Sequence, residues 1–197
     1  MKAVPEAQRV AAHLWFWEAY EPAVKCDLSC VALRSEAGWI FIDPIPLAVN
    51  AMAEILEIAP AAAVVATSGN HERACCVVAD ALGVPFYAPE CEVTPDRRLA
   101  AGQVVFGDVA VHAVPGAGPG EIALWHAASR TLCLGDAVIH LPSHGFALLP
   151  EKYCADFRAM RGALDGLCDL EPEIITFAHG TPILVGAREK LRALLAE

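Results

Sequence analysis

The stretch that decides the fold runs from Ala63 to Ala74 and reads AVVATSGNHERA. Its apolar first half predicts a buried strand that ends at Thr67, Gly69 predicts a tight turn, and the remainder predicts a helix. In an α/β protein the carboxyl end of a strand is where functional side chains usually lie. The polar residues that follow Thr67 are therefore the first candidates for a functional site.

Two later segments have the same character. Residues 132–136 read LCLGD, and residues 174–180 read IITFAHG. Each is an apolar strand that runs directly into a polar side chain next to a glycine, Asp136 in the first and His179 in the second. We expect these three strand ends to converge on one site.

The order and sequence of these segments resemble the metallo-β-lactamase superfamily. That family carries a Thr-His-x-His-x-Asp-His turn after a strand, then Pro-Gly-His-x-Pro-Gly, then Gly-Asp, and late in the chain Gly-His or His-Gly. The matching segments here are TSGNHER at 67–73, PGAGPG at 115–120, GD at 135–136 and HGTP at 179–182. The resemblance spans nearly the whole chain. It implies a single domain over residues 1–197, an αββα sandwich of two mixed β-sheets with helices on the outer faces, and a site at the edge between the sheets.

Most metal-ligand positions of the family are substituted in this chain. The changed positions are those of four histidines and one aspartate, which are here Ser68, Asn70, Glu72, Arg73 and Ala117. Only Asp136 and His179 match the family. Members of the family generally hold two metal ions, usually zinc, so the resemblance implies a dismantled dinuclear site. Hydroxyl and amide groups are weak zinc ligands and a methyl group is none, so we expect no metal at the first site.

Arg73 falls where the family places a histidine ligand of the second metal. A guanidinium stays protonated and has no lone pair to give, so it cannot bind a metal. We therefore predict that Arg73 supplies the positive charge in place of zinc, through a two-pronged ion pair with Asp136 or Glu72. On this interpretation the protein has no cofactor.

His71 leaves an alternative open. It occupies a position that is not a ligand in the family, and the simpler interpretation is that it caps the helix start or packs against a neighbour. If the turn is reorganised, His71, Asp136 and His179 form a two-histidine, one-carboxylate set that suits one zinc or iron ion. The same three residues are the candidate catalytic residues.

Other polar residues are candidates for substrate contacts. Residues 136–144 read DAVIHLPSH, and Pro142 with Gly145 predicts a loop at the rim of the site. The substrate-binding candidates are Ser68, Asn70, Glu72, Arg73, His140 and His144. We expect Ser68 to cap the helix rather than to act as a nucleophile.

The composition narrows the class of protein. The chain has 197 residues, 56% of them hydrophobic, which suits one domain with an extensive core. Its net charge of −10, without a cluster of Lys or Arg, argues against nucleic-acid binding. No apolar run approaches the length of about 18 residues that a membrane helix needs. Met1–Arg9 lacks an apolar signal core, and the eight cysteines are expected to be reduced thiols of a cytoplasmic protein.

Apolar spacing predicts the remaining elements. Strands are expected at 13–20, 29–34, 38–43, 62–66, 84–87, 103–106, 109–114, 121–126, 131–134 and 173–178. Helices are expected at 47–59, 71–82, 151–168 and 185–196, and a loop at 88–99. His13, His112 and His126 fall on predicted strands and are interpreted as packed or surface residues.

These residues support two functions. The first is a non-metallo or weakly active descendant of the hydrolase family that binds a small molecule, with Arg73 suited to an anionic ligand. The alternative is a metal-dependent hydrolase with a remodelled single-metal site built on Asp136 and His179, where a bound water is the nucleophile. A purely structural role, as a homodimer or a partner module, rests on the fold alone. Metal analysis separates the first two functions.

Overall fold

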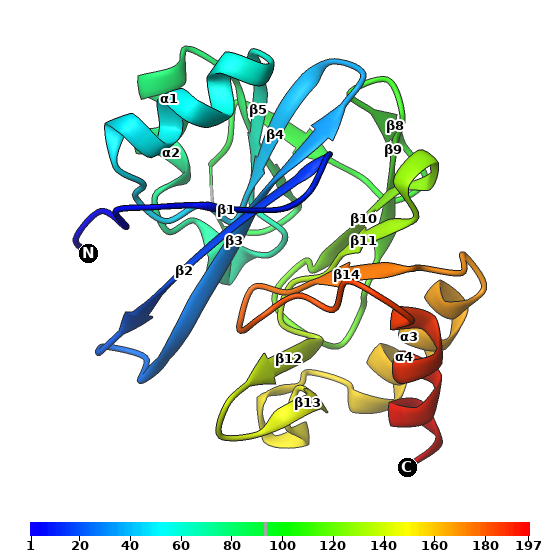
Figure 1. Cartoon of the computed structure of the whole chain (residues 1–197). Helices are drawn as coiled ribbons and strands as arrows, with labels where there is room; N and C mark the ends of the chain where they lie inside the picture. Colours follow the sequence, from blue (N-terminus) through cyan, green and yellow to red (C-terminus); the bar gives the residue numbers. More distant parts are fainter. Residues whose placement is uncertain (93) are drawn as a thin grey trace.

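Two β-sheets pack face to face, with helices on both outer sides (Figure 1). The computed structural model describes residues 1–92 and 94–197. One sheet has seven strands in the order β1-β2-β3-β4-β5-β6-β7, and the other has five in the order β14-β11-β10-β9-β8. Strands β12 and β13 form a separate two-stranded sheet. This is the four-layer αββα architecture expected from the sequence.

The seven-stranded sheet changes from antiparallel to parallel pairing at β4. Its strands are β1 (Gln8–Ala11), β2 (Leu14–Glu21), β3 (Cys26–Ser35), β4 (Gly38–Ile42), β5 (Ala61–Val65), β6 (Phe86–Pro89) and β7 (Arg97–Leu99). The helices α1 (Val49–Ile58) and α2 (Cys75–Leu82) connect parallel strands and cover the outer face of this sheet.

The five-stranded sheet is antiparallel except for its last pair, β11 with β14. Its strands are β8 (Val104–Val105), β9 (Val109–Ala113), β10 (Ile122–His126), β11 (Thr131–Cys133) and β14 (Ile174–Thr176). Helices α3 (Phe157–Cys168) and α4 (Ala187–Ala196) cover its outer face, and the hairpin of β12 (Val138–Leu141) and β13 (Gly145–Leu148) lies near them (Figure 1).

Strand β2 shows how the layers share one core. Leu14 and Phe16 lie between the two sheets, while Trp15 and Trp17 pack on the side of α1 and α2. Because successive side chains of a strand point to opposite faces, a strand that is apolar at every position buries both of its faces. A third cluster fills the space between the five-stranded sheet and the helices α3 and α4.

The helix expected at 71–82 is shorter in the structure. It consists of the 3-10 turn η1 (Gly69–His71) followed by α2, and the chain between them passes through Arg73, whose φ of 39° is left-handed. A non-glycine residue in this conformation interrupts an α-helix. The expected end at Gly83 is confirmed, because that residue is the left-handed cap of α2.

Three other expectations need correction. The helix expected at 151–168 is a 3-10 turn, η3 (Glu151–Tyr153), followed by α3, whose first turn is capped by the Asp156 side chain. The loop expected at 136–144 contains strand β12, and its proline lies in the turn of the β12–β13 hairpin. The loop expected at 88–99 ends in strand β7; residue 93 of that loop lies outside the described residues.

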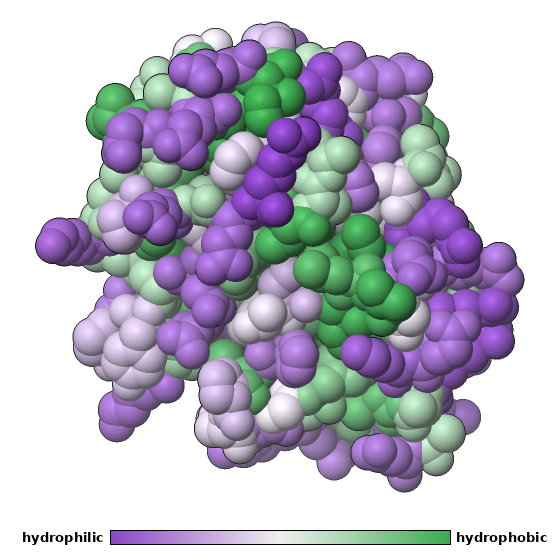
Figure 2. All heavy atoms as spheres, viewed as in Figure 1, coloured by the Kyte–Doolittle hydropathy of each residue, from purple (hydrophilic) through white to green (hydrophobic). Residues whose placement is uncertain are grey.

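The surface in the view of Figure 2 is mostly hydrophilic, with a hydrophobic area near its centre. Within the described ranges, none of the helices combines the length and the apolar character needed to span a bilayer.

Candidate metal centre

The three strand ends singled out in the sequence converge on one site. The chain after β5 carries His71, the chain after β11 carries Asp136, and the chain after β14 carries His179. One ligand atom from each residue lies within 4.8 Å of the others. The Oδ1 atom of Asp136 is 3.1 Å from Nε2 of His71 and 3.2 Å from Nε2 of His179.

His71 is buried and is fixed from behind by Asp43. Its Nδ1 lies 3.1 Å from Oδ2 of Asp43 and 2.9 Å from Oγ1 of Thr67. The Thr67 hydroxyl and its backbone N–H both donate to the carboxylate of Asp43, at 2.6 and 2.7 Å. Since the hydroxyl proton is used in this way, Nδ1 of His71 carries a proton and donates it to this pair.

His179 is fixed in a similar way from the other side. Its Nδ1 lies 2.9 Å from the backbone carbonyl oxygen of Asp27 and 3.4 Å from Sγ of Cys26. A carbonyl oxygen can only accept, so Nδ1 of His179 carries the proton and Nε2 faces Asp136.

Three acceptor atoms therefore face one another at the centre of the site. In neutral imidazoles with a proton on Nδ1, both Nε2 atoms present lone pairs to the same oxygen of Asp136. Such an arrangement is repulsive unless a positive charge lies among the three atoms. A proton on a histidine or a metal cation meets this requirement. In metal sites, a histidine ligand typically donates its other N–H to a carboxylate or a carbonyl, as both histidines do here.

The electrostatics of the isolated side chains agree with this geometry. Burial opposes a charge on His71, but Asp43 and Asp136 outweigh it and raise the pKa of His71 to about 10. Burial raises the pKa of Asp136, yet His71 and His179 hold it well below its ordinary value. The pKa of Asp43 is also lowered, since His71 and Arg73 overcome the effect of its burial. A positive charge is thus favoured between the carboxylates of Asp43 and Asp136, where His71 lies.

The predicted ion pair of Arg73 with Asp136 or Glu72 is wrong. The Arg73 guanidinium donates to three backbone carbonyls, those of Ser29 at 2.8 Å, Asp43 at 3.0 Å and Ala178 at 2.9 Å. These carbonyls belong to β3 and to the chain just after β4 and β14, so the side chain ties the two sheets together. A planar group with five N–H donors can satisfy several strand ends at once, and the histidines already face Asp136.

Glu72 lies away from this centre. It is exposed, and its Oε1 accepts a weak hydrogen bond from Sγ of Cys76 at 3.7 Å. Glu72 therefore does not replace the aspartate ligand of the family, although it occupies the same position in the turn.

Ser68 and Asn70 support the turn that presents His71. Ser68 is the N-cap of η1, and its Oγ accepts the N–H of Asn70 at 3.2 Å, which confirms the expected capping role. The Asn70 amide donates to Oδ2 of Asp136 at 3.4 Å. Asn70 also lines a neighbouring cavity, in keeping with a substrate contact.

The two histidines of the β12–β13 hairpin differ in position. His140 lies beside the site through its backbone, whose N–H donates to the carbonyl of His179. Its ring contacts Phe146 and Phe177, and its Nδ1 donates to the carbonyl of Thr181 at 2.7 Å. His144 is exposed in the hairpin turn. Within the described residues, neither histidine belongs to the lining of the cavity.

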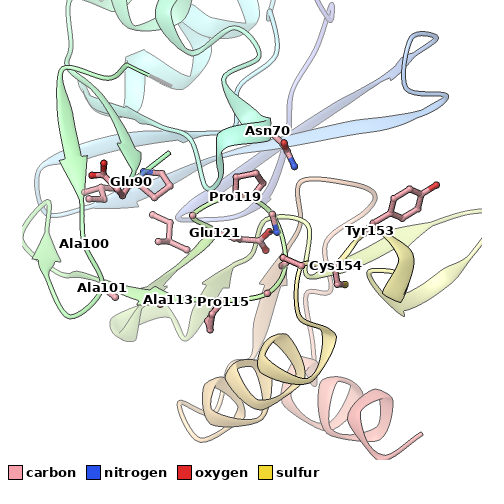
Figure 3. Close-up of a pocket in the computed structure, with 18 of the residues that line it drawn as sticks. Asn70, Glu90, Ala100, Ala101, Ala113, Pro115, Pro119, Glu121, Tyr153 and Cys154 are labelled. Carbon is pink, nitrogen blue, oxygen red and sulfur yellow. Dashed lines mark hydrogen bonds between the residues drawn. The ribbon is translucent and has the colours of Figure 1, made fainter. Parts of the chain in front are cut away.

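A cavity of about 1050 Å³ has Asn70, whose amide contacts Asp136, in its lining (Figure 3). The loop 115–120 and the neighbouring Glu121 form its central wall, with Glu90 and Ala100 on one side and Tyr153 and Cys154 on the other. Asn70 joins this lining to the ligand set.

Glu121 and Asp43 are site residues that the sequence pattern did not single out. Glu121 is 3% exposed, and its two oxygens accept the N–H groups of Gly118 at 2.9 Å and Ala137 at 2.8 Å. Burial, and secondarily Asp136, raises the pKa of Glu121 to about 7. Asp43 directly follows strand β4, and Glu121 directly follows the Pro-Gly loop 115–120. These positions are the only signal in the sequence that could have identified them.

Comparisons with known proteins place the fold in a defined group. The family described as the metallo-beta-lactamase superfamily matches residues 8–196. A metallo-beta-lactamase from Pontibacter korlensis is 15% identical, with a TM-score of 0.73 over 98% of this chain and 99% of that one. One from Hirschia baltica is 14% identical, with a TM-score of 0.73 over 99% and 97% of the two chains. One from Erythrobacter litoralis, with beta mercaptoethanol in its active site, is 12% identical, with a TM-score of 0.75 over 96% and 95%. No curated protein matches the chain.

Proposed function

Because the chain belongs to the metallo-beta-lactamase superfamily, we propose that it is a metal-dependent hydrolase with a remodelled single-metal site formed by His71, Asp136 and His179. The observation that supports this proposal is the convergence of two imidazole nitrogens on the same oxygen of Asp136, at 3.1 and 3.2 Å. Two histidines and one carboxylate are a ligand set that suits zinc or iron and leaves positions open for water and substrate.

The chain's own residues suit such a site. Asp43 and the carbonyl of Asp27 hold the two imidazoles with Nε2 toward Asp136. A bound ion would polarise a substrate carbonyl and lower the pKa of its water. Glu121 lines the adjoining cavity, and a carboxyl with a pKa of about 7 can accept and return a proton near neutral pH. We propose Glu121 as the general base of the reaction.

The first metal position of the family is part of the same proposal. Ser68 is used as a helix cap, the Asn70 amide donates to Asp136, and Ala117 offers no ligand atom. One ion rather than two is therefore expected. The substrate is proposed to be a small ester or amide, because Asn70 both lines the cavity and contacts Asp136, and because the net charge of −10 disfavours nucleic acid.

A second candidate function is a metal-free protein that binds a small molecule in the same cavity. The position of His71 between the carboxylates of Asp43 and Asp136 favours it, because a protonated imidazole there balances their charge without an ion. The two candidates differ in one measurable property, the metal content.

Elemental analysis of protein purified without a histidine tag tests the proposal. We expect about one zinc or iron per chain, lost in Asp136→Ala and in His179→Ala. His140→Ala is the matched control, since this neighbouring histidine donates to Thr181 and should keep the metal. Metal-free protein that binds no added zinc, with unchanged thermal stability in chelator, would overturn the hydrolase and favour the second candidate.

A further inference from the structure

A second cluster of polar side chains lies at the opposite end of β11 from Asp136. His126 ends strand β10, Ser129 ends the 3-10 turn η2 (Ala127–Ser129), and Thr131 begins β11. Asp108 reaches this cluster from the turn between β8 and β9. None of these residues contributes to the candidate metal centre.

The three side chains of Asp108, His126 and Ser129 form a continuous hydrogen-bonded row. Oδ2 of Asp108 lies 2.8 Å from Nε2 of His126, and Nδ1 of His126 lies 2.6 Å from Oγ of Ser129. The other carboxylate oxygen of Asp108 accepts the backbone N–H of Glu36 at 3.2 Å. A nucleophile, a base and a group that orients the base are thus in contact, which is the arrangement that activates a serine.

The direction of the hydrogen bonds follows from the carboxylate. Ionised Asp108 can only accept, so Nε2 of His126 carries a proton and the lone pair of its Nδ1 faces Ser129. Ser129 then donates its single proton to His126. Oγ1 of Thr131 lies 2.8 Å from Oγ of Ser129 and 2.9 Å from Nε2 of His13. Because a hydroxyl can donate or accept, Thr131 can donate to Ser129 while the Ser129 proton is directed to His126. Burial, and secondarily His126, lowers the pKa of His13.

Ser129 is more exposed than the histidine that contacts it. His126 is 6% exposed, whereas Ser129 is half-buried in a turn whose other residues, Ala127 and Ala128, are exposed. The base is therefore more shielded from water than the serine.

We propose that Ser129 is an activated nucleophile that accepts acyl or phosphonyl groups from small, reactive esters and fluorides. In the acyl transfer, Ser129 Oγ forms a bond to the carbonyl carbon as its proton passes to Nδ1 of His126. The bond from that carbon to the leaving oxygen breaks, and the proton moves from His126 to the departing group. The proposal does not depend on the metal centre.

The chain contains a matched control for this chemistry. Ser143 Oγ lies 2.8 Å from Nδ1 of His144, so a second serine has the same contact with a histidine and greater exposure. Within the described residues, however, no carboxylate forms an ion pair with His144. If exposure and contact with a histidine were enough for reactivity, Ser143 would react. If the full row of carboxylate, histidine and serine is needed, only Ser129 reacts.

Labelling of the full chain with a fluorophosphonate, followed by peptide mass spectrometry, tests the proposal. The reaction forms an Oγ–P bond and releases fluoride, with the serine proton taken up by His126. We expect one adduct, on Ser129, that is absent in Ser129→Ala and forms roughly 100-fold more slowly in His126→Gln. Asp108→Asn should slow labelling in the same direction if His126→Gln does not fold.

The variant Ser143→Ala should label Ser129 at the unchanged rate, because Ser143 lies outside the row. No adduct on Ser129, equal labelling of Ser143, or an undiminished rate in folded His126→Gln would each overturn the proposal.

Discussion

The carboxylate of Asp43 lies 3.1 Å from Nδ1 of His71, on the side of the ring away from Asp136. This contact determines which nitrogen of His71 carries the proton and turns its Nε2 toward the other two ligand candidates. Asp43 adopts a left-handed backbone conformation with a φ of 50°, directly after strand β4. The carboxylate is held in turn by Thr67, so the orientation of His71 is set by residues that lie just after β4 and β5.

Replacing Asp43 by asparagine should weaken zinc binding roughly 10- to 100-fold, as measured by competition with a chromophoric chelator. Asparagine tolerates the left-handed backbone conformation, so the chain path should be retained. Asp27→Asn is the matched control, since His179 contacts the backbone carbonyl of Asp27 and that group is unchanged. Equal affinities of the two variants would contradict the proposed role of Asp43.

Replacing Arg73 by methionine should lower the free energy of unfolding by about 3 to 5 kcal/mol, because three carbonyls lose a charged donor. Urea unfolding measures this loss. Arg97→Met removes an exposed guanidinium that lies over the Tyr87 ring and should cost less than about 1 kcal/mol. Folded Arg73→Met should retain its metal. Loss of metal without loss of stability would instead favour a direct role for Arg73 in the site.

Glu121 should make the protein less stable as the pH rises from about 4.5 to about 7. Its pKa is raised to about 7 in the folded chain, so the folded state holds a proton that the unfolded state has already released. The contribution is fully present below the ordinary pKa of a glutamate and is lost as the pH passes about 7, by about 3 kcal/mol in total. Urea unfolding at a series of pH values should show a shallower decline for Glu121→Gln. Parallel curves for the two proteins would show that Glu121 does not titrate in this range.

Gly135 should not tolerate a side chain. A Cβ at this position would meet Oγ1 of Thr67 at 2.8 Å and Cδ of Glu121 at 3.0 Å. Gly135→Ala is therefore expected to lower the free energy of unfolding by about 1 to 3 kcal/mol and to reduce metal affinity by displacing Asp136. Gly162→Ala, in helix α3 with open space around the added carbon, should stabilise by about 0.5 to 1 kcal/mol. A neutral effect of Gly135→Ala would show that this turn can shift.

The helix expected at 71–82 and the loop expected at 136–144 show where local sequence was insufficient. The apolar spacing of 71–82 is helical, but Arg73 leaves the helical conformation because its side chain donates to the carbonyls of Ser29 in β3 and of Ala178 just after β14. In 136–144, Pro142 correctly predicted the turn that now joins β12 to β13. The strand before that turn forms because it pairs with β13. Both outcomes depend on partners outside the segment itself, the distant carbonyls in one case and strand β13 in the other.

The sequence by itself determined the four layers, through its resemblance to the metallo-β-lactamase family and through apolar strands and helices that must bury their faces, as Leu14 and Trp15 do on the two sides of β2. It also determined that Asp136 and His179 belong to one site, since both follow buried strands. Only the tertiary structure decided that His71 rather than Arg73 faces Asp136. That choice depends on the carboxylate of Asp43 and the carbonyls of Ser29 and Ala178, which become neighbours only when the two sheets pack together.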